Sequence, residues 1–372
     1  MPDRNAPPQV ALLEPVFTPR IWGARSLSPL YSDKSAIAEP IGEAWLTSNE
    51  SHFATGPFAD ETLGATWKIL ATDPKHPDKM PPGAQFPLLA KFIFPAEKLS
   101  VQVHPGDEFA SRHEHAAGGN GKTEMWYVVD AEPNAAVWLG LEEWVTPERF
   151  SEAIQAGNAD QLVERIPVKK GDAIFCPAGT VHYIGPGMTL CEIQQYSDLT
   201  YRVFDYNRLG ADGKPRELHL EKAMKVIRFG AQLGGKLTAV EVKEGSVTKT
   251  SLVACPYFIV ERFDFEKSWR APGLADHFNV YIILEGTGEL SHVSKPGTAA
   301  ASSTEQVPPQ PYQPGQAWLA PPRSPSITFN AQSKTSLLRA FVPHPVNGLN
   351  EFVRDMRANK IPESQWSRLV FT

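Results

Sequence analysis

A short apolar segment, Leu99–Pro105, carries three polar residues at alternate positions. Successive residues of a strand point to opposite sides, so Ser100, Gln102 and His104 would point together while the residues between them pack. Three polar groups on one face of an apolar strand are costly unless something satisfies them. A metal ion or a polar ligand would do so; an exposed strand face with ordinary hydrogen bonds is the alternative.

Two further segments carry side chains of similar chemistry. Lys122, Glu124 and Trp126 share one face if Gly121–Tyr127 forms a strand. His182 follows a glycine-containing turn at the start of another expected strand. The plainer interpretations are a solvated edge strand for the first segment and a structural histidine for the second.

Four of these side chains form a donor set that suits a divalent cation: Gln102, His104, Glu124 and His182. Two neutral imidazoles, one carboxylate and one amide oxygen are typical ligands of zinc, at about 2.0–2.2 Å for each nitrogen or oxygen. A single carboxylate leaves a divalent ion with net positive charge. Such an ion could stabilise negative charge that develops on a substrate oxygen.

An arginine lies shortly after the candidate metal histidine, in the aromatic-rich segment Glu192–Tyr206. The guanidinium of Arg202 is planar and always charged, so it suits an anionic substrate beside a metal site. A structural ion pair with Asp198 or Asp205 is the alternative.

Composition limits the class of protein. The 372 residues are 42% hydrophobic and 21% charged, which excludes a disordered chain, a collagen and a long coiled coil. The net charge of −6 predicts no binding to nucleic acid or to an anionic membrane.

We expect no transmembrane helix and no secretion signal, and three cysteines without a CxxC spacing favour the cytoplasm. The motifs of serine hydrolases, P-loop NTPases and dinucleotide enzymes are absent from the sequence.

Short apolar runs and 34 prolines predict a mainly β protein, because proline interrupts helices and central strands. Strands so short and numerous indicate a sandwich or a barrel. The expected strands are Pro87–Phe94, Lys98–His104, Glu124–Asp130, Ala135–Leu141, Asp172–Cys176, Thr189–Tyr196 and Tyr201–Tyr206, followed by Tyr257–Phe263, Asn279–Glu285, Gly288–His292, Ala317–Ala320 and Thr335–Phe341.

A few helices interrupt this pattern. Thr146 and Pro147 are typical of a helix start, and the apolar spacing that follows predicts two short helices up to Ile166. Further helices are expected over Leu218–Phe229 and Leu349–Arg357. The segment Pro296–Pro314, rich in Ala, Ser, Gln and Pro, predicts a mobile loop.

A pattern shared by the two β-rich blocks suggests a duplicated domain in which only the first copy kept a working site. We therefore divide the chain into a catalytic domain, 1–240, with the metal site and inserted helices, and a degenerate β domain, 241–372. The pattern aligns Gly171, Pro177, Gly179 and His182 with Gly315, Pro321, Arg323 and Ser326.

These segments resemble the type I mannose-6-phosphate isomerase family of the cupin superfamily. The resemblance rests on Gln-Val-His-Pro at 102–105, Gly-Lys-x-Glu-x-Trp at 121–126 and Thr-Tyr-Arg-Val at 200–203, in the family's order. Weaker support comes from Pro19–Gly23 and Ile41–Trp45. The resemblance implies two cupin (jelly-roll) β-sandwich domains with a few added helices.

The resemblance also implies a reaction, the interconversion of mannose 6-phosphate and fructose 6-phosphate through an enediol or enediolate. One zinc ion per chain would be bound by the four ligands already named, and Glu192 would be the base because it matches a carboxylate of the family. A buried ion pair with Arg202 is the alternative role of Glu192. The implied catalytic residues are Arg202, Glu192 and Lys122, and the implied substrate-binding residues are Ser100, Lys122 and Arg202.

Three other functions stay open at this point. One is a metal-dependent isomerase of a different sugar phosphate, because Leu46 follows the tryptophan of Ile41–Trp45 where relatives often carry a glutamate. Another is a cupin that binds a sugar without catalysis. The last is an iron-dependent cupin dioxygenase, although Gln102 as a fourth protein ligand argues against it.

Overall fold

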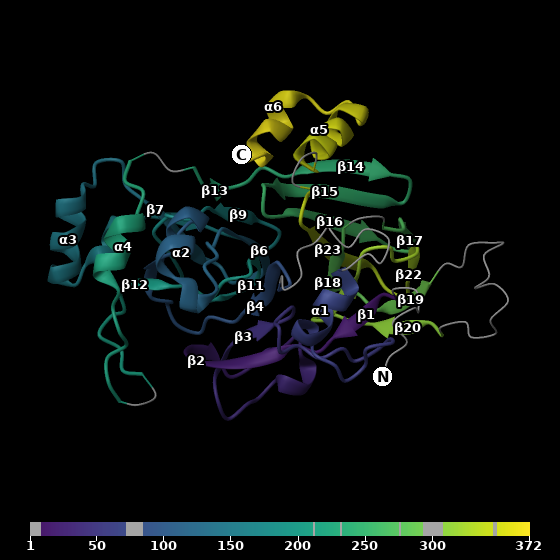
Figure 1. Ribbon diagram of the computed structural model, residues 1–372, viewed down its shortest axis with the longest axis horizontal. Helices are drawn as coiled ribbons and strands as arrows, with labels where there is room; N and C mark the ends of the chain where they lie inside the picture. Colours follow the sequence, from purple (N-terminus) through teal and green to yellow (C-terminus); the bar gives the residue numbers. More distant parts are fainter. Residues whose placement is uncertain are drawn as a thin grey trace.

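Antiparallel sheets dominate the structure (Figure 1), a computed structural model that describes residues 9–71, 85–210, 213–230, 233–274, 277–292, 308–344 and 348–372. The mainly β prediction is therefore confirmed. Four sheets form two sandwiches, and a seven-stranded sheet of one sandwich packs against the seven-stranded sheet of the other. Val128 and Val137 lie in the core of the first sandwich, while Phe92 and Val260 belong to the core between the sandwiches.

The first sandwich consists of a five-stranded and a seven-stranded sheet. The five-stranded sheet has the order β12 (Tyr201–Phe204), β5 (Val101–Val103), β10 (His182–Ile184), β7 (Ala136–Leu141) and β8 (Val163–Pro167). The seven-stranded sheet has the order β13 (Gly235–Lys236), β9 (Ala173–Cys176), β6 (Glu124–Ala131), β11 (Met188–Gln195), β4 (Leu88–Ile93), β3 (Ile41–Trp45) and β2 (Val16–Ala24).

The second sandwich pairs a seven-stranded with a four-stranded sheet. The larger sheet has the order β1 (Ala11–Leu13), β21 (Ala317–Ala320), β18 (Asn279–Glu285), β23 (Thr335–Phe341), β16 (Ile259–Phe265), β15 (Val247–Ala254) and β14 (Val240–Glu244). The smaller sheet has the order β17 (Ser268–Ala271), β22 (Ile327–Ala331), β19 (Gly288–His292) and β20 (Gln310–Tyr312).

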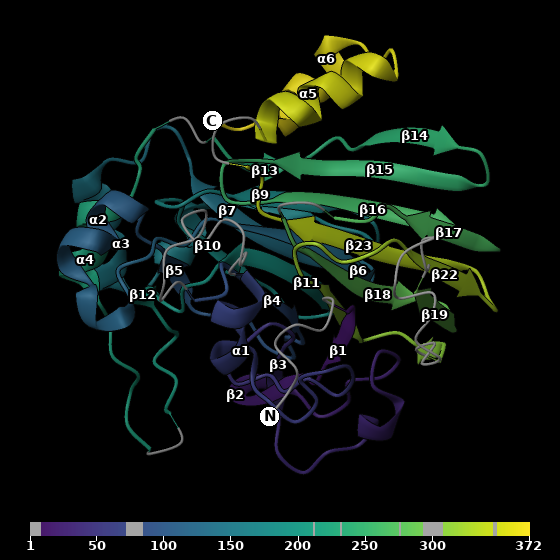
Figure 2. The same cartoon turned by 45° about the vertical axis from the view of Figure 1, so that its right-hand side comes forward.

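Most helices lie on the outside of the sandwiches (Figure 2), whereas α1 (Leu63–Ala71) packs against the core between them. The other helices are α2 (Asp107–His113), α3 (Pro147–Ala156), α4 (Leu220–Val226), α5 (Gly348–Ala358) and α6 (Glu363–Trp366), with 3-10 helices η1 (Ser32–Lys34), η3 (His115–Ala117), η4 (Ala159–Leu162) and η6 (Ser367–Leu369). α3 and α4 pack on the outer face of the five-stranded sheet, and α5 and α6 pack near β14 and β15. Within the described ranges, every helix is too short or too polar to cross a membrane.

Two helix predictions differ from the structure. α3 starts where expected, with the Thr146 Oγ1 accepting a hydrogen bond from the Arg149 backbone, but the second helix up to Ile166 is wrong. A single 3-10 turn ends at Leu162, and the next five residues form β8, in which Ile166 pairs with Val137. The helix expected over Leu218–Phe229 is shorter, because the residue after Ile227 donates its N–H to Gly179 rather than continuing α4.

The prediction of a loop over Pro296–Pro314 is wrong in its described part. Residues 293–307 lie outside the described residues. Gln310–Tyr312 forms β20, which pairs with β19, and Tyr312 is buried with its hydroxyl 3.0 Å from Thr335 Oγ1. One aromatic side chain therefore anchors a segment whose composition is otherwise that of a loop.

The backbone supports the proposed equivalence of the two β-rich blocks. Gly171 precedes β9 with φ +90°, and Gly315 precedes β21 with φ +85°. Arg323 has φ +68° where Gly179 has φ +85°, so an arginine keeps a conformation that favours glycine. The division at residue 240 stays a prediction, and β1 joins the sheet of the second sandwich by pairing with β21.

A buried cluster of charges joins β2, β3 and β4. Glu43 on β3 binds Arg20 of β2 (Nη2–Oε2 2.6 Å) and Lys91 of β4 (Nζ–Oε1 3.3 Å). Burial alone would raise the pKa of Glu43, but Lys91 and Arg20 outweigh it and lower this pKa to about 2. The ionised carboxylate thus stabilises the folded state above its ordinary pKa, and this contribution is lost as the pH falls towards 2.

We predict that Glu43→Gln lowers the free energy of unfolding at pH 7 by up to about 3 kcal/mol, the free-energy equivalent of this pKa difference. The difference from wild type should shrink as the pH falls below about 4.5, because the wild-type carboxylate then takes up a proton. Urea unfolding at several pH values checks this. A difference that stays constant with pH would contradict the assignment.

Candidate metal centre

Three predicted site residues lie side by side across the five-stranded sheet. In the strand register, Arg202 of β12 lies opposite Gln102 of β5, and Gln102 lies opposite His182 of β10. Directly opposed residues of antiparallel strands share a face, so these side chains point to the same side of the sheet. His104 follows the end of β5. The alternation seen in the sequence therefore places the polar side chains between the two sheets.

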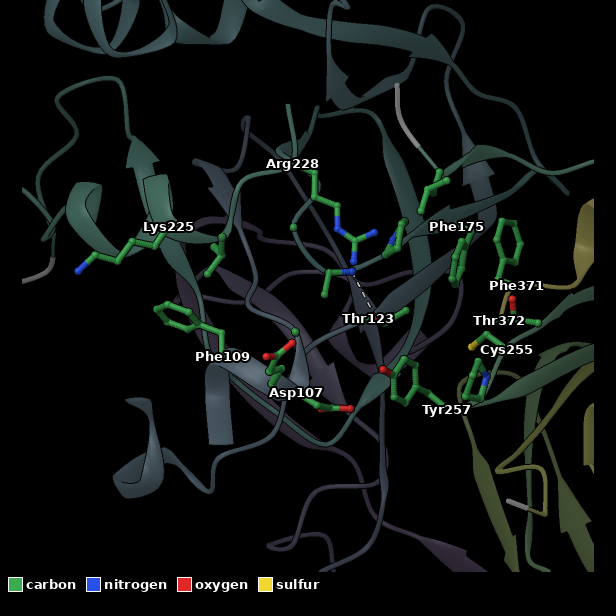
Figure 3. Close-up of a pocket in the computed structure, with 18 of the residues that line it drawn as sticks. Asp107, Phe109, Thr123, Phe175, Lys225, Arg228, Cys255, Tyr257, Phe371 and Thr372 are labelled. Atoms are coloured by element: carbon green, nitrogen blue, oxygen red, sulfur yellow. Dashed lines mark hydrogen bonds between the residues drawn. The ribbon is translucent and has the colours of Figure 1, made fainter. Parts of the chain in front are cut away.

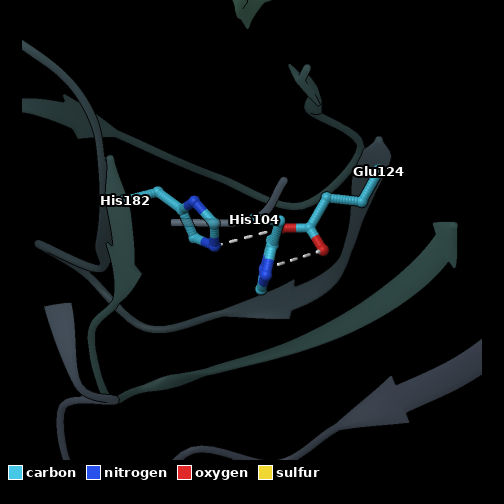
Figure 4. Close-up of side chains that lie close together, drawn as sticks. All are labelled: His104, Glu124 and His182. Atoms are coloured by element: carbon cyan, nitrogen blue, oxygen red, sulfur yellow. Dashed lines mark ion pairs between the residues drawn. The ribbon is translucent and has the colours of Figure 1, made fainter. Parts of the chain in front are cut away.

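The facing sheet supplies the carboxylate. Glu124 begins β6, and its oxygens lie 3.2 Å from His182 Nε2 and 3.7 Å from His104 Nε2 (Figure 4). The ligating atoms of the three residues all lie within 4.8 Å of one another, and each residue is at most 1% exposed. The structure therefore brings together the three strongest ligand candidates.

The histidines have the protonation that metal ligands need. His104 Nδ1 lies 2.7 Å from the Leu199 carbonyl, and His182 Nδ1 lies 2.9 Å from the Thr180 carbonyl. A carbonyl only accepts hydrogen bonds, so each Nδ1 carries the proton and each Nε2 directs a lone pair at the carboxylate. Burial lowers the pKa of both imidazoles, that of His182 to about 4, and keeps them neutral.

Two lone pairs and a carboxylate directed at one another require positive charge between them. Lys122 meets this need in part, because its Nζ lies 3.0 Å from Glu124 Oε2 and 3.1 Å from His104 Nε2. Burial alone would lower the pKa of Lys122, but Glu124 and Glu192 raise it above its usual range, so the ammonium stays charged. The two imidazole nitrogens and the Glu124 carboxylate are together a donor set that fits a divalent cation.

Gln102 fits as the fourth ligand. Its Nε2 lies 3.2 Å from His182 Nε2, and its Oε1 lies 3.5 Å from the hydroxyl of Ser100. A 180° rotation of the Gln102 side-chain amide would direct its oxygen at the position between the two histidines and the Glu124 carboxylate. Ser100 is buried, while Gln102 is partly exposed, so the side of the site near Gln102 faces solvent.

A second carboxylate lies beside the ligands. Glu192 on β11 has its Oε1 3.5 Å from Lys122 Nζ and 3.7 Å from Lys91 Nζ, and all three residues are buried. Burial, and next the charge of Glu124, raise the pKa of Glu192 to about 7, although the two lysines act in the opposite direction. A carboxylate with such a pKa suits proton transfer near neutrality.

Arg202 lies at the open side of the site. It is partly exposed, and its Nη1 donates a hydrogen bond of 2.9 Å to the Glu217 carbonyl. Asp205 binds Arg208 and Arg216 instead. No ion pair in the described part of the chain joins Arg202 to Asp205 or Asp198, so the expected alternative of a structural pair is absent there.

The sequence interpretation missed Lys91 and the role of Glu43. Lys91 is the single charged residue of β4, whose other residues are all apolar and buried. A lysine in the middle of an apolar strand is rarely buried without a partner, so its position in the sequence indicates a buried ion pair. Glu43 lies in the segment Ile41–Trp45, which carries the weaker resemblance, and the local sequence does not indicate its partners.

A groove of about 720 Å³ lies on the other side of β6 (Figure 3). Thr123 lines it, and this residue's neighbours Lys122 and Glu124 point away to the metal side. Asp107, also in the groove, accepts hydrogen bonds from the Gly121 backbone (2.8 Å) and from Gln195 (3.0 Å). These bonds hold the start of β6 in place from behind the candidate metal centre.

The chain has relatives among known proteins. It is 36% identical over 286 residues to "Mannose-6-phosphate isomerase ManA" of Bacillus subtilis (strain 168), which covers 74% of this chain and 86% of that protein. The crystal structure of a mannose 6-phosphate isomerase from Bacillus subtilis matches with a TM-score of 0.76 and 29% identity, over 89% of this chain and 99% of that chain.

A more distant structure shares the fold. A mannose 6-phosphate isomerase bound with zinc and yttrium matches with a TM-score of 0.64 and 15% identity, over 90% of this chain and 99% of that chain. No family model matches the sequence. The extent of the identity to ManA, together with the two-sandwich fold, shows that the chain belongs to the type I mannose-6-phosphate isomerase family, of the cupin superfamily.

Proposed function

We propose that the protein is a zinc-dependent aldose–ketose isomerase that interconverts mannose 6-phosphate and fructose 6-phosphate. The observation that carries this proposal is the convergence of two neutral imidazoles and a carboxylate beside a buried glutamate–lysine pair. The names of the relatives supply the substrate. An isomerase of this kind needs a base for carbon-bound protons and positive charge for an oxyanion, and both are present.

One zinc ion per chain would be held by Gln102, His104, Glu124 and His182. When bound, zinc supplies a Lewis acid that stabilises negative charge on substrate oxygen. The structure that binds zinc shares the fold of this chain. The donor set here also suits zinc on its own chemistry, because imidazole nitrogens and carboxylate oxygens are its usual ligands.

Glu192 is the base of the proposed reaction. It removes the proton from C2 of the open-chain aldose, the C–H electron pair forms the C1–C2 double bond, and the former carbonyl electrons move to O1. The proton of O2 then passes to O1, O2 becomes a carbonyl, and the electrons of the C1–C2 double bond take the proton back from Glu192 at C1. Lys122, 3.5 Å from Glu192 Oε1, places a positive charge near the oxyanion.

Arg202 and Ser100 bind the substrate in this proposal. Arg202 lies on the solvent-facing side, and its Nε is buried with no hydrogen-bond partner among the described residues. A guanidinium with an unused donor suits the phosphate group. The hydroxyl of Ser100 would donate a hydrogen bond to a sugar oxygen near Gln102.

We assign no partner other than a small sugar phosphate. We place the enzyme in the cytoplasm, where its three free cysteines stay reduced.

A coupled assay on mannose 6-phosphate tests the reaction. We expect turnover with zinc present, loss of turnover with a chelator, and recovery when zinc is added back. Parallel assays use other aldose phosphates at the same concentration. Turnover of one of these, with none on mannose 6-phosphate in the zinc-loaded protein, would assign the enzyme to a different sugar phosphate.

The role of Glu192 is tested with Glu192→Gln, which keeps the shape but cannot accept a proton. We expect kcat to fall by about 10²–10⁴ while the zinc content stays unchanged. His182→Ala should instead lose the zinc. Glu285→Gln, which changes a partly exposed glutamate at the end of β18 in the second sandwich, serves as the control. A Glu192→Gln enzyme with wild-type kcat would remove this residue from the mechanism.

A further inference from the structure

We infer that Glu43 is a positioning residue of the isomerase: it holds Lys91 so that the ammonium is shared with Glu192 and the base keeps its place. This inference rests on the proposed function, because Glu192 is the group whose position is controlled. Glu43 binds Arg20, Trp45 and Lys91, all outside the candidate metal ligands. It therefore acts through Lys91 rather than on the substrate.

The strand register brings the two carboxylates to one lysine. Lys91 lies opposite Glu192 on one neighbouring strand and opposite Trp45 on the other. Its Nζ is 3.3 Å from Glu43 Oε1 and 3.7 Å from Glu192 Oε1. The ammonium thus sits between two carboxylates and closer to the one that lies farther from the metal ligands.

The Glu43 carboxylate is itself fixed by several donors. Its Oε2 accepts from Arg20 Nη2 at 2.6 Å and from the indole Nε1 of Trp45 at 3.0 Å, while its Oε1 faces Lys91. Side chains held on both oxygens cannot rotate without losing a charge-assisted bond. Arg20 is 30% exposed, so the arrangement is anchored near the surface.

Alternating charges run from this anchor to the candidate metal centre, in the order Arg20, Glu43, Lys91, Glu192, Lys122 and Glu124. Each inner charge of this series lies between two charges of opposite sign, which offsets the cost of burying it. If Glu43 lost its charge, Glu192 would be the nearest carboxylate left to Lys91. The ammonium would move onto Glu192 and draw its carboxylate away from the substrate.

The test compares Glu43→Gln with Glu43→Asp and with a matched control. Glu261→Gln changes an equally buried glutamate that binds Arg339 in the second sandwich. We expect Glu43→Gln to lower kcat by about 10–100-fold, as supporting residues of metal sites often do, with KM and zinc content within about twofold of wild type. Glu43→Asp, which keeps the charge, should recover part of kcat, and Glu261→Gln should keep it.

Several results would overturn the inference: wild-type kcat in Glu43→Gln, zinc loss that parallels the fall in kcat, or an equal fall in Glu261→Gln. Arg20→Gln, at a partly exposed position, serves if Glu43→Gln does not fold; it should lower kcat with zinc retained, and unchanged kcat would count against the inference.

A second readout does not depend on turnover. A crystal structure of Glu43→Gln should show the Lys91 Nζ–Glu192 distance shortened from 3.7 Å. An unmoved lysine would refute the positioning role whatever the enzyme's activity. If the wild-type protein has no activity on mannose 6-phosphate, the proposed function fails, and this distance still decides the positioning role.

Discussion

Two imidazole lone pairs and two carboxylates meet between the sheets of the first sandwich, where water is nearly excluded, and only positive charge can hold them there. Lys122 contacts His104 and Glu124, and it lies beside Glu192. A metal cation bound by the histidines would supply the remaining positive charge that these lone pairs and carboxylates require. Protein interiors do not keep such groups together without compensation. The arrangement is therefore best explained as a site built for a metal ion and for chemistry on an oxyanion.

The sheets position these groups because strand register is rigid. The row of Arg202, Gln102 and His182 comes from one sheet, and Glu124 and Glu192 come from adjacent strands of the facing sheet. The second sandwich has a buried ion pair, Glu261–Arg339, but no group of histidines and carboxylates that could bind a metal among its described residues. The corresponding space is filled with stacked aromatic rings, including Phe263, Trp269 and Phe329. This second sandwich supports the first through the core between the two large sheets.

Local alternation predicted the strands that carry the candidate ligands, including β5 and β6. Gln102 and His104 are two residues apart, so strand geometry alone places them on one side. Lys91 was missed because its partners, Glu43 and Glu192, come from neighbouring strands and only the pairing reveals them. The spacing of Val163 and Ile166 predicts a helix over the strand Val163–Pro167, because a run this short holds too few apolar residues to distinguish helix from strand.

The pairing of β1 with β21 and the strand at Gln310–Tyr312 depend on contacts with distant residues, which no local pattern encodes. The metal centre was more predictable than these elements. Its residues are polar groups in apolar segments and stand out, whereas an edge strand differs little from a loop in composition. Tyr312 shows this, since a single buried side chain orders its segment.

X-ray absorption at the zinc edge of the zinc-loaded protein tests the central claim most directly. The account predicts one zinc per chain with only nitrogen and oxygen neighbours, at about 2.0–2.2 Å, two of them imidazoles. Cys176, whose sulfur lies 3.3 Å from His182 Nδ1, offers the competing ligand. A sulfur neighbour at about 2.3 Å, or a protein that binds no zinc, would contradict the account.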